Sequence, residues 1–416
     1  MSNYNYMKSV YLLCLTYLLS LSSCNNTKKS DSYVLIISFD GFRSEYLDWY
    51  PTPNMDQFAQ RGVKSEGLIP VFVSKTFPNH YSIATGLYAE NHGLIGNHFY
   101  DPKFDDHYTL SDRSKVEDPK FYGGEPIWVT AEKQGVNTAS YFWVGTEAPI
   151  KNTFPKKWKT YEHGFPFESR IDSVVSWLSL PEKKRPKLCM LYFHEPDAIG
   201  HDTGPKSKET ALMVSKMDSL FGTLVHKLQN TPVSSQLDII VLSDHGMAEI
   251  SSKRTINLED YTSLKDIKQE GSGPYALLYG DNKINLQKVV KDLNKVDHIK
   301  AYLKKDIPER FHFKNHYRIK DILVLADEGW YIQNQAIGSN SKAGQYIPKG
   351  GTHGYDNQLK SMHALFIASG PSFTSGKQID PFENVNIYPL ICEILNIKPH
   401  PDIDGNINNI SHILKQ

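Results

Sequence analysis

The apolar residues of this chain gather into short, nearly uninterrupted runs that are separated by longer amphipathic stretches. The first run, Tyr33 to Phe39, is rich in β-branched and aliphatic side chains, which is typical of a strand buried on both faces. Four later runs have the same character: Thr138 to Val144, Lys187 to Phe193, Leu237 to Ser243 and Ala364 to Ala368. These runs predict the buried strands of one sheet.

Helical periodicity lies between the apolar runs. The longest amphipathic stretch extends from Ser207 to Asn230, and shorter ones cover Asn54 to Gly62, Pro78 to Gly86 and Pro381 to Asn396. Strands that alternate with helices indicate the α/β fold class, with a mostly parallel central sheet and helices on both faces.

The residue composition of the chain changes between residues 250 and 345. This stretch is polar, Lys-rich and aromatic-rich, with short strand-like pieces at Tyr275 to Tyr279 and Ile322 to Leu325. We interpret it as a smaller insertion, or cap, that packs over the main sheet. The predicted organisation is therefore a single catalytic domain over residues 33–416 with a cap insertion at about 250–345.

The first residues have the pattern of a targeting segment. Lys8 precedes an apolar run, Val10 to Leu21, which is short for a bilayer span and fits a secretory h-region. The run ends in Leu21-Ser22-Ser23-Cys24, which resembles a bacterial lipobox; an ordinary signal peptide or an uncleaved anchor is the alternative. We predict a lipoprotein signal peptide over 1–24, a polar tether over 25–32 and a lipid on Cys24. The expected location is then periplasmic or outer-membrane-attached.

The charge balance limits the ligands that the chain can attract. Lys plus Arg and Asp plus Glu each number 46, so the formal net charge is zero. Without a global basic field, no nucleic-acid-binding surface is predicted, and an anionic substrate has to be held locally. Bound metal ions would supply the positive charge that such a substrate needs.

Polar residues follow several of the predicted strands. In open α/β sheets ligands bind beyond the carboxyl ends of the strands. A single Asp after a strand is often a helix N-cap, but four such segments in one pattern indicate a site. The segments are Ser38 to Gly41, Phe193 to His201, Leu242 to Met247 and Gly350 to Asp356.

Asp and His side chains at these strand ends are a suitable donor set for zinc, which needs no thiolate. Asp197 and His201 are four residues apart, so both can reach one ion from a single turn. Thr76 lies at the start of a helical pattern, where a hydroxyl group is close to the positive end of the helix dipole. Thr76 is therefore a candidate nucleophile; the alternative is a simple N-cap.

Together these residues resemble the nucleotide pyrophosphatase/phosphodiesterase family, in a short bacterial form, within the alkaline phosphatase superfamily. The resemblance extends from Tyr33 to about Ile394 and implies an alkaline phosphatase-like fold. The segments that carry it include Thr52 to Asp56, Lys75 to His80, Thr85 to Tyr88, Asn91 to Gly93, Glu195 to Asp197, Gly200-His201, Ser243 to Gly246 and Thr352 to Asp356.

The resemblance implies two Zn²⁺ ions, each held by carboxylate and imidazole groups. The implied ligands of one ion are Asp197, His201 and His353, and those of the other are Asp40, Thr76, Asp244 and His245.

Further site residues follow from the same resemblance. Thr76 would be the catalytic nucleophile and Asn97 the donor to a phosphate oxygen. Three aromatic residues, Phe77, Tyr161 and Tyr192, fall where the family binds the nucleoside base or another group of the substrate.

The implied activity is cleavage of phosphodiester or pyrophosphate bonds of nucleotides or related small diesters through a covalent phospho-threonine. A phosphomonoesterase or phosphonate hydrolase on the same fold is the nearest alternative. A dianionic monoester needs extra cationic groups, and the absence of an arginine close to Thr76 in the sequence favours diesters. A sulfatase would need a Cys/Ser-x-Pro-x-Arg motif, which residues 76–80 do not match. A non-catalytic binding lipoprotein is disfavoured because every implied ligand and Thr76 are present.

Overall fold

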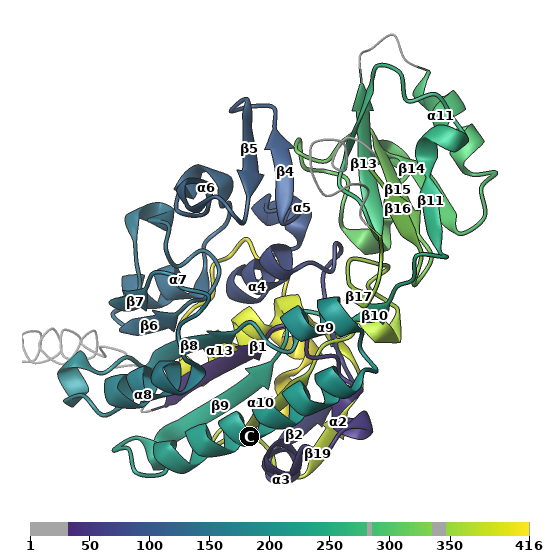
Figure 1. Ribbon diagram of the computed structural model, residues 1–416. Helices are drawn as coiled ribbons and strands as arrows, with labels where there is room; N and C mark the ends of the chain where they lie inside the picture. Colours follow the sequence, from purple (N-terminus) through teal and green to yellow (C-terminus); the bar gives the residue numbers. More distant parts are fainter. Residues whose placement is uncertain (1–31, 281–284, 335–346, 416) are drawn as a thin grey trace, which may run out of the picture. The chain divides into compact units, whose positions relative to one another are not determined.

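The structure is a computed structural model that describes residues 32–280, 285–334 and 347–415. Figure 1 shows how their helices and strands are arranged. The predicted signal peptide and all but the last residue of the predicted tether lie outside the described residues, so the lipid anchor and the location of the protein stay predictions. Among the described residues, no helix has the length and apolar character needed to cross a membrane.

Within the described residues, the central sheet has eight strands, in the order β19-β2-β18-β9-β1-β8-β6-β7. Their bounds are Tyr33–Phe39 (β1), Val63–Ser65 (β2), Thr138–Tyr141 (β6), Lys157–Lys159 (β7), Leu188–Phe193 (β8), Leu237–Leu242 (β9), Phe366–Ser369 (β18) and Lys377–Ile379 (β19). Strand β18 is antiparallel to both of its neighbours, and the other pairs are parallel. This topology confirms the predicted α/β class with a mostly parallel sheet.

The two-residue repeat of β1 explains why helices cover both faces of the sheet. Val34 and Ile36 join one buried cluster, whereas Leu35 and Ile37 join the other. The first cluster includes residues of α4 (Thr76–Thr85), α7 (Ile127–Lys133) and α13 (Ile387–Leu395). The second includes residues of α3 (Pro53–Gln60), α8 (Phe167–Leu178) and α10 (Lys208–Leu228). Figure 1 shows these two helical layers on opposite sides of β1.

Short elements at the ends of the strands complete the main body. The short helices are α2 (Tyr46–Trp49), α5 (Ala89–His92), α6 (Arg113–Val116) and α9 (Asp197–Thr203). Three small two-stranded sheets pair β4 (His98–Asp101) with β5 (Asp106–Thr109), β3 (Leu68–Ile69) with β20 (Phe382–Glu383), and β10 (Ala248–Glu249) with β17 (Gly351–Thr352).

The stretch that the sequence sets apart at about 250–345 contains a second sheet with its own buried cluster. Its antiparallel strands lie in the order β12-β13-β15-β14, with bounds Ile267–Glu270 (β12), Tyr275–Gly280 (β13), Ile299–Leu303 (β14) and Ile322–Ala326 (β15). Helix α11 (Leu286–Leu293) packs on β14, and β11 (Thr255–Asn257) pairs with β16 (Tyr331–Gln333). We refer to residues 250–345 as the insertion.

The predicted strands are found, but one helix and some element ends differ. The helix predicted from Pro381 begins only at Ile387, because Phe382 and Glu383 pair with β3 as a short strand. Strand β6 ends at Tyr141, and the next residue, Phe142, has a φ of 71°, which turns the chain out of the strand. Helix α8 was not predicted.

Asp218 of α10 provides a test of how the helices are fixed to one another. Its buried carboxylate accepts hydrogen bonds from the backbone N–H groups of Asn54 (3.2 Å) and Met55 (2.8 Å) in the first turn of α3. Asp218→Ala leaves these donors unsatisfied and should lower the free energy of unfolding by about 2–3 kcal/mol. Urea unfolding measures the change. The neighbouring exposed variant Ser219→Ala should stay within about 0.5 kcal/mol of wild type; equal effects of the two substitutions would contradict this account.

Candidate active site

The parallel strands deliver the predicted ligands to one edge of the sheet. Strand β1 lies between β8 and β9, with Phe39 beside Phe193 and Ser38 beside Leu242. Each of these strands ends at that level, and the chain continues into Asp40, into α9 with Asp197 and His201, and into the loop with Asp244 and His245. His353 comes from the segment after β17.

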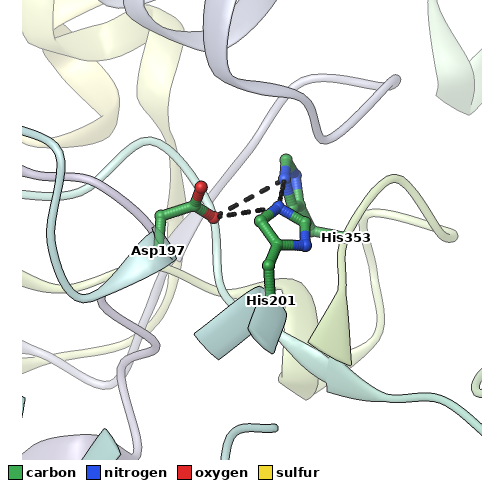
Figure 2. Close-up of side chains that lie close together, drawn as sticks. All are labelled: Asp197, His201 and His353. Carbon is green, nitrogen blue, oxygen red and sulfur yellow. Dashed lines mark hydrogen bonds and ion pairs between the residues drawn. The ribbon is translucent and has the colours of Figure 1, made fainter. Parts of the chain in front are cut away.

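The first group of ligand-type side chains consists of Asp197, His201 and His353 (Figure 2). Asp197 and His201 lie one turn apart on α9, as their spacing predicts. The two imidazole Nε2 atoms are 3.1 Å apart, and Asp197 Oδ1 lies 3.5 Å from that of His201 and 3.6 Å from that of His353. Three donor atoms therefore face one point, where one cation could contact all of them.

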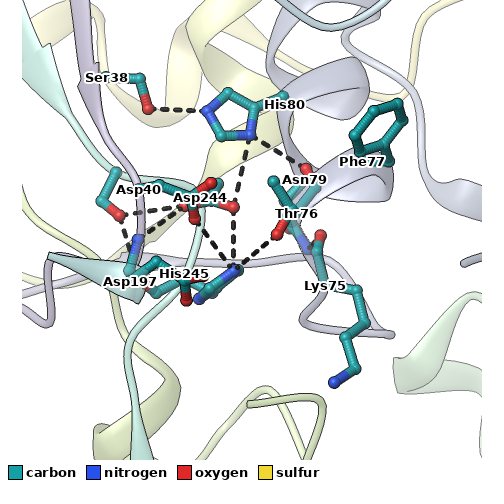
Figure 3. A network of polar contacts seen from close by, with 12 residues as sticks. Ser38, Asp40, Lys75, Thr76, Phe77, Asn79, His80, Asp197, Asp244 and His245 are labelled. Carbon is teal, nitrogen blue, oxygen red and sulfur yellow. Dashed lines mark hydrogen bonds and ion pairs between the residues drawn. The ribbon is translucent and has the colours of Figure 1, made fainter. Parts of the chain in front are cut away.

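The second group consists of Asp40, Asp244 and His245, all of them buried (Figure 3). His245 Nε2 lies 3.4 Å from Asp40 Oδ1 and 3.0 Å from Asp244 Oδ2. The two groups are neighbours, because the rings of His245 and His353 stack with their centroids 3.4 Å apart. All six predicted Asp and His ligands thus lie in one place.

Three buried carboxylate oxygens in these groups test whether metal ions fit. Within the described part of the chain, Asp40 Oδ1, Asp197 Oδ1 and Asp244 Oδ2 accept no hydrogen bond. A buried anionic oxygen without a donor is costly unless a cation neutralises it. Each of these oxygens points at the imidazole nitrogen of its own group, so the donor set fits two metal ions.

The orientation of the three imidazoles is consistent with metal binding. The Nδ1 atom of each ring contacts a backbone carbonyl: that of Gly351 for His201 (2.9 Å), Gly246 for His245 (2.8 Å) and Ser74 for His353 (2.8 Å). An Nδ1–H group that donates to a carbonyl leaves the lone pair on Nε2. The Nε2 atom of each ring faces the carboxylates. Each ring can therefore direct its Nε2 lone pair toward a metal ion between these groups.

Burial and neighbouring charges shift the pKa values of two of the predicted ligands. Burial raises the pKa of the Asp40 carboxyl well above its usual value, and the carboxylates of Asp244 and Asp197 raise it further. Burial lowers the pKa of the His353 imidazole well below its usual value, as do the neighbouring His245 and Lys75. A neutral imidazole is the ligand form, and a bound cation would favour the ionised form of Asp40.

Thr76 is the first residue of α4, and its hydroxyl group points into the second group (Figure 3). Its Oγ1 atom lies 3.3 Å from His245 Nε2. The N-cap of α4 is Lys75, so the hydroxyl of Thr76 is not used as a cap. One turn later His80 contacts the Thr76 carbonyl through Nδ1 (3.0 Å) and Ser38 Oγ through Nε2 (2.8 Å), which fixes the start of the helix against β1.

A cavity of about 300 Å³ opens beside the two groups. All the other predicted site residues line it: Phe77, Asn97, Tyr161 and Tyr192. The Oδ1 atom of Asn97 accepts from the backbone N–H of Phe77 (2.9 Å), so its Nδ2 group can donate to a ligand. The hydroxyl of Tyr192 donates to Asp40 Oδ2 (2.5 Å), which ties this ring to the second group.

The cavity also contains residues that the sequence did not single out. Arg113 lines it, although Arg113 lies 37 positions after Thr76 in the chain. Its guanidinium contacts the carboxylates of Glu147 and Glu117, and Glu147 in turn accepts from the backbone N–H of Tyr161 (3.0 Å). No local motif marks this pair, because only the folded chain brings Arg113 and Glu147 together.

Comparison with known families finds a match over most of the chain. The family model described as "Type I phosphodiesterase / nucleotide pyrophosphatase" matches residues 34–356. The chain is 38% identical over 402 residues to the venom phosphodiesterase of Naja atra and 37% identical over 392 residues to ectonucleotide pyrophosphatase/phosphodiesterase family member 3 of Rattus norvegicus. These alignments cover 92% of this chain but only 46% and 44% of the relatives, so the chain spans less than half of their length.

Solved structures of related proteins share the fold. Murine ectonucleotide pyrophosphatase/phosphodiesterase 5 superimposes with a TM-score of 0.85 at 33% sequence identity, over 92% of this chain and 100% of that chain. The human protein of the same name gives the same TM-score, 0.85, at 34% identity and with the same coverage. One further match, with TM-score 0.85, 33% identity and the same coverage, is an inactive variant of the murine protein in complex with AMP. These likenesses confirm the predicted alkaline phosphatase-like fold.

The two groups predict a definite metal stoichiometry. Wild-type protein should bind two Zn²⁺ per chain, and His353→Ala should bind one, because it removes a donor that only the first group uses. Elemental analysis after zinc loading and dialysis measures the ratio. His194→Ala is the matched control, since His194 lines the same cavity outside both groups and its loss should leave the ratio unchanged. Fewer than about one zinc per wild-type chain would rule out the two-metal interpretation.

Proposed function

Because this chain belongs to the type I phosphodiesterase / nucleotide pyrophosphatase family, we propose that it hydrolyses phosphodiester or pyrophosphate bonds of nucleotides with Thr76 as the nucleophile. The observation that supports this proposal most strongly is the position of the Thr76 hydroxyl. It lies 3.3 Å from His245 Nε2, at the wall of a cavity that both ligand groups share.

Two zinc ions are the cofactors that the donor set fits. Asp197, His201 and His353 would hold one ion, and Asp40, Thr76, Asp244 and His245 would hold the other. When bound, the ions supply Lewis acidity, which lowers the proton affinity of a coordinated hydroxyl and neutralises charge on phosphate oxygens. Six carboxylate and imidazole ligands without a thiolate suit zinc better than a soft metal.

The chemistry of Thr76 follows from its place at the N-terminus of α4. The Thr76 oxygen attacks phosphorus and its proton passes to water, while the bond to the departing alcohol or phosphate breaks. That group carries away the electron pair, and a departing alcohol takes up a proton from water. A phospho-threonine diester results. Water then attacks the same phosphorus and displaces the Thr76 oxygen, which regains a proton. The positive end of the α4 dipole favours an anionic phosphoryl group here.

Asn97 is suited to hold a non-bridging phosphate oxygen. Its side chain is fixed because Oδ1 accepts from the Phe77 N–H, immediately after the nucleophile in the chain. The Nδ2 group therefore keeps a constant position relative to Thr76 while charge develops on the phosphate. A preorganised donor of this kind stabilises the transition state without reorganising.

The walls of the cavity favour a nucleoside as part of the substrate. Aromatic and aliphatic side chains form the part of it that we call the nucleoside wall: Phe77, Leu110, Val116, Phe142 and Tyr161. A flat base can stack on such rings while the phosphate stays at the polar end. The AMP complex of the murine relative, an inactive variant, supports the same class of ligand for this chain.

A phosphomonoester is a weaker candidate, because its dianionic phosphate needs a cation beyond the metal ions. Arg113 is the arginine that lines the cavity in the described residues. Its guanidinium is already engaged with Glu147 and Glu117, so the three side chains together carry no surplus positive charge. This arrangement favours the monoanionic diester.

The nucleophile can be tested by substitution. Thr76→Ala should lower kcat/KM for p-nitrophenyl thymidine monophosphate by about a thousandfold or more, because the attacking oxygen is lost. Thr76→Ser retains the hydroxyl and should retain part of the activity. The release of p-nitrophenol measures both variants, with p-nitrophenyl phosphate as the monoester comparison. A Thr76→Ala enzyme with undiminished activity would exclude the proposed nucleophile, and a wild-type preference for the monoester would favour the phosphatase alternative.

The nucleoside wall can be tested at Tyr161. Tyr161→Ala removes a ring from the cavity and should raise KM for the nucleotide ester by about tenfold, since stacking on one base contributes about 1–3 kcal/mol. KM for bis-p-nitrophenyl phosphate, which lacks a base, should change much less. Tyr161→Phe retains the ring and should resemble wild type. Equal changes in KM for the two substrates would argue against a nucleoside at this wall.

A further inference from the structure

Arg318 of the insertion is buried, with 3% of its surface exposed, yet it lies outside the cavity. Its Nε–H donates to the buried carboxylate of Asp101 on β4 at 2.6 Å. Its terminal nitrogens donate to the backbone carbonyls of Gly93 (2.6 Å), Phe121 (2.8 Å) and Lys120 (3.3 Å). One guanidinium therefore joins three separate segments of the main body to the insertion.

These segments are the ones that lead into the substrate cavity. Gly93 begins the stretch that ends at Asn97, and the β4–β5 hairpin begins directly after it. The Asn97 carbonyl accepts from the Leu110 N–H (3.1 Å) at the base of the hairpin. Leu110 starts the stretch that continues through Arg113 to Val116, all three of which line the cavity. Figure 1 shows this hairpin between α6 and the insertion.

A series of ring contacts connects Arg318 to the cavity wall. Its guanidinium lies 5.0 Å from the centroid of Phe99 and 5.7 Å from that of Phe121. Both rings pack on Tyr108, at centroid distances of 4.9 and 5.1 Å, and Tyr108 packs on Phe77 at 6.2 Å. A displaced guanidinium would therefore disturb Phe77 through three packed rings.

A second connection runs through hydroxyl groups. The hydroxyls of Tyr108 and Tyr122 are 3.0 Å apart, and Tyr122 donates to the Val116 carbonyl at 2.7 Å. All of these groups are buried. Buried side chains are closely packed and can move little without displacing their neighbours. The position of Arg318 and the shape of the cavity wall are therefore coupled.

We propose that Arg318 is a positioning residue for the substrate, through which the insertion holds Asn97 and the nucleoside wall at a fixed distance from Thr76. This inference rests on the proposed function, and it assigns the insertion a part in substrate recognition. An arginine suits this position because the five N–H donors of its rigid fork can serve one carboxylate and three carbonyls at once, whereas an ammonium group has only three donors.

The test compares Arg318→Met with Arg254→Met in the metal-loaded full chain. Arg254 belongs to the same insertion, but its guanidinium donates to the carbonyls of Gly329 (3.0 Å) and Glu249 (3.1 Å), which do not line the cavity. Zinc content and thermal unfolding are recorded for every variant. KM and kcat are measured for p-nitrophenyl thymidine monophosphate and for bis-p-nitrophenyl phosphate.

For Arg318→Met we expect kcat to fall with both substrates, and KM to rise about tenfold for the nucleotide ester but less than about twofold for bis-p-nitrophenyl phosphate. Zinc content should stay at the wild-type value. Arg318→Lys keeps the charge near Asp101 but not the carbonyl contacts, so it should show an intermediate KM for the nucleotide ester. Arg254→Met should keep both KM values.

Unchanged KM values in a folded, zinc-loaded Arg318→Met enzyme would overturn the proposal. The proposal would also fail if Arg254→Met raised KM for the nucleotide ester, relative to bis-p-nitrophenyl phosphate, as much as Arg318→Met does. That result would reveal a general effect of destabilising the insertion. If Arg318→Met does not fold, the KM values of Arg318→Lys for the two substrates test the proposal instead. Unchanged values would overturn it. A wild-type enzyme without diesterase activity would instead refute the proposed function, and the inference would fall with it.

Discussion

The carboxylates of Asp40 and Asp244 are buried and that of Asp197 is half-buried, and the three lie close together at the carboxyl edge of the sheet. Each has one buried oxygen that accepts no hydrogen bond in the described structure. Like charges in a poorly hydrated site repel one another, which is why the pKa of Asp40 is raised by its burial and by its two acidic neighbours. Such a cluster is stable in its ionised form only when positive charge is placed among the oxygens. This need for positive charge is the physical constraint on the site, and the two proposed metal ions would meet it.

The fold meets this requirement with few elements. Strand β1 lies between β8 and β9, so the residues that follow these three strands meet without long connections. One turn of α9 brings Asp197 and His201 to the same side, and the stacked rings of His245 and His353 join the two groups. Helix α4 adds Thr76 from the opposite wall, held by the contacts of His80. Asn97 and Leu110, on either side of the β4–β5 hairpin, line the cavity, and the insertion contacts this hairpin through Arg318.

Much of this arrangement could be predicted from the sequence, because its determinants are local. The apolar run at Tyr33 to Phe39 coincides with β1, and the Asp and His motifs indicate the side chains that the fold brings together at the strand ends. Antiparallel β18 was not distinguished, since a strand buried on both faces has the same composition in either direction. Two contacts could not be predicted, because no motif marks them. Arg113 and Glu147 are 34 positions apart in the chain, and Arg318 and Asp101 are 217 positions apart. The N-terminal residues lie outside the described structure, so the lipid anchor stays a prediction.

The most direct test of the central claim is a crystal structure of the zinc-loaded protein with anomalous diffraction recorded above and below the zinc absorption edge. Two anomalous peaks are predicted. One should lie within bonding distance of Asp197 Oδ1 and the Nε2 atoms of His201 and His353, and the other within bonding distance of Asp40, Asp244, His245 and the Thr76 hydroxyl. A single peak, or peaks outside these donor atoms, would contradict the account of a two-metal site built around Thr76.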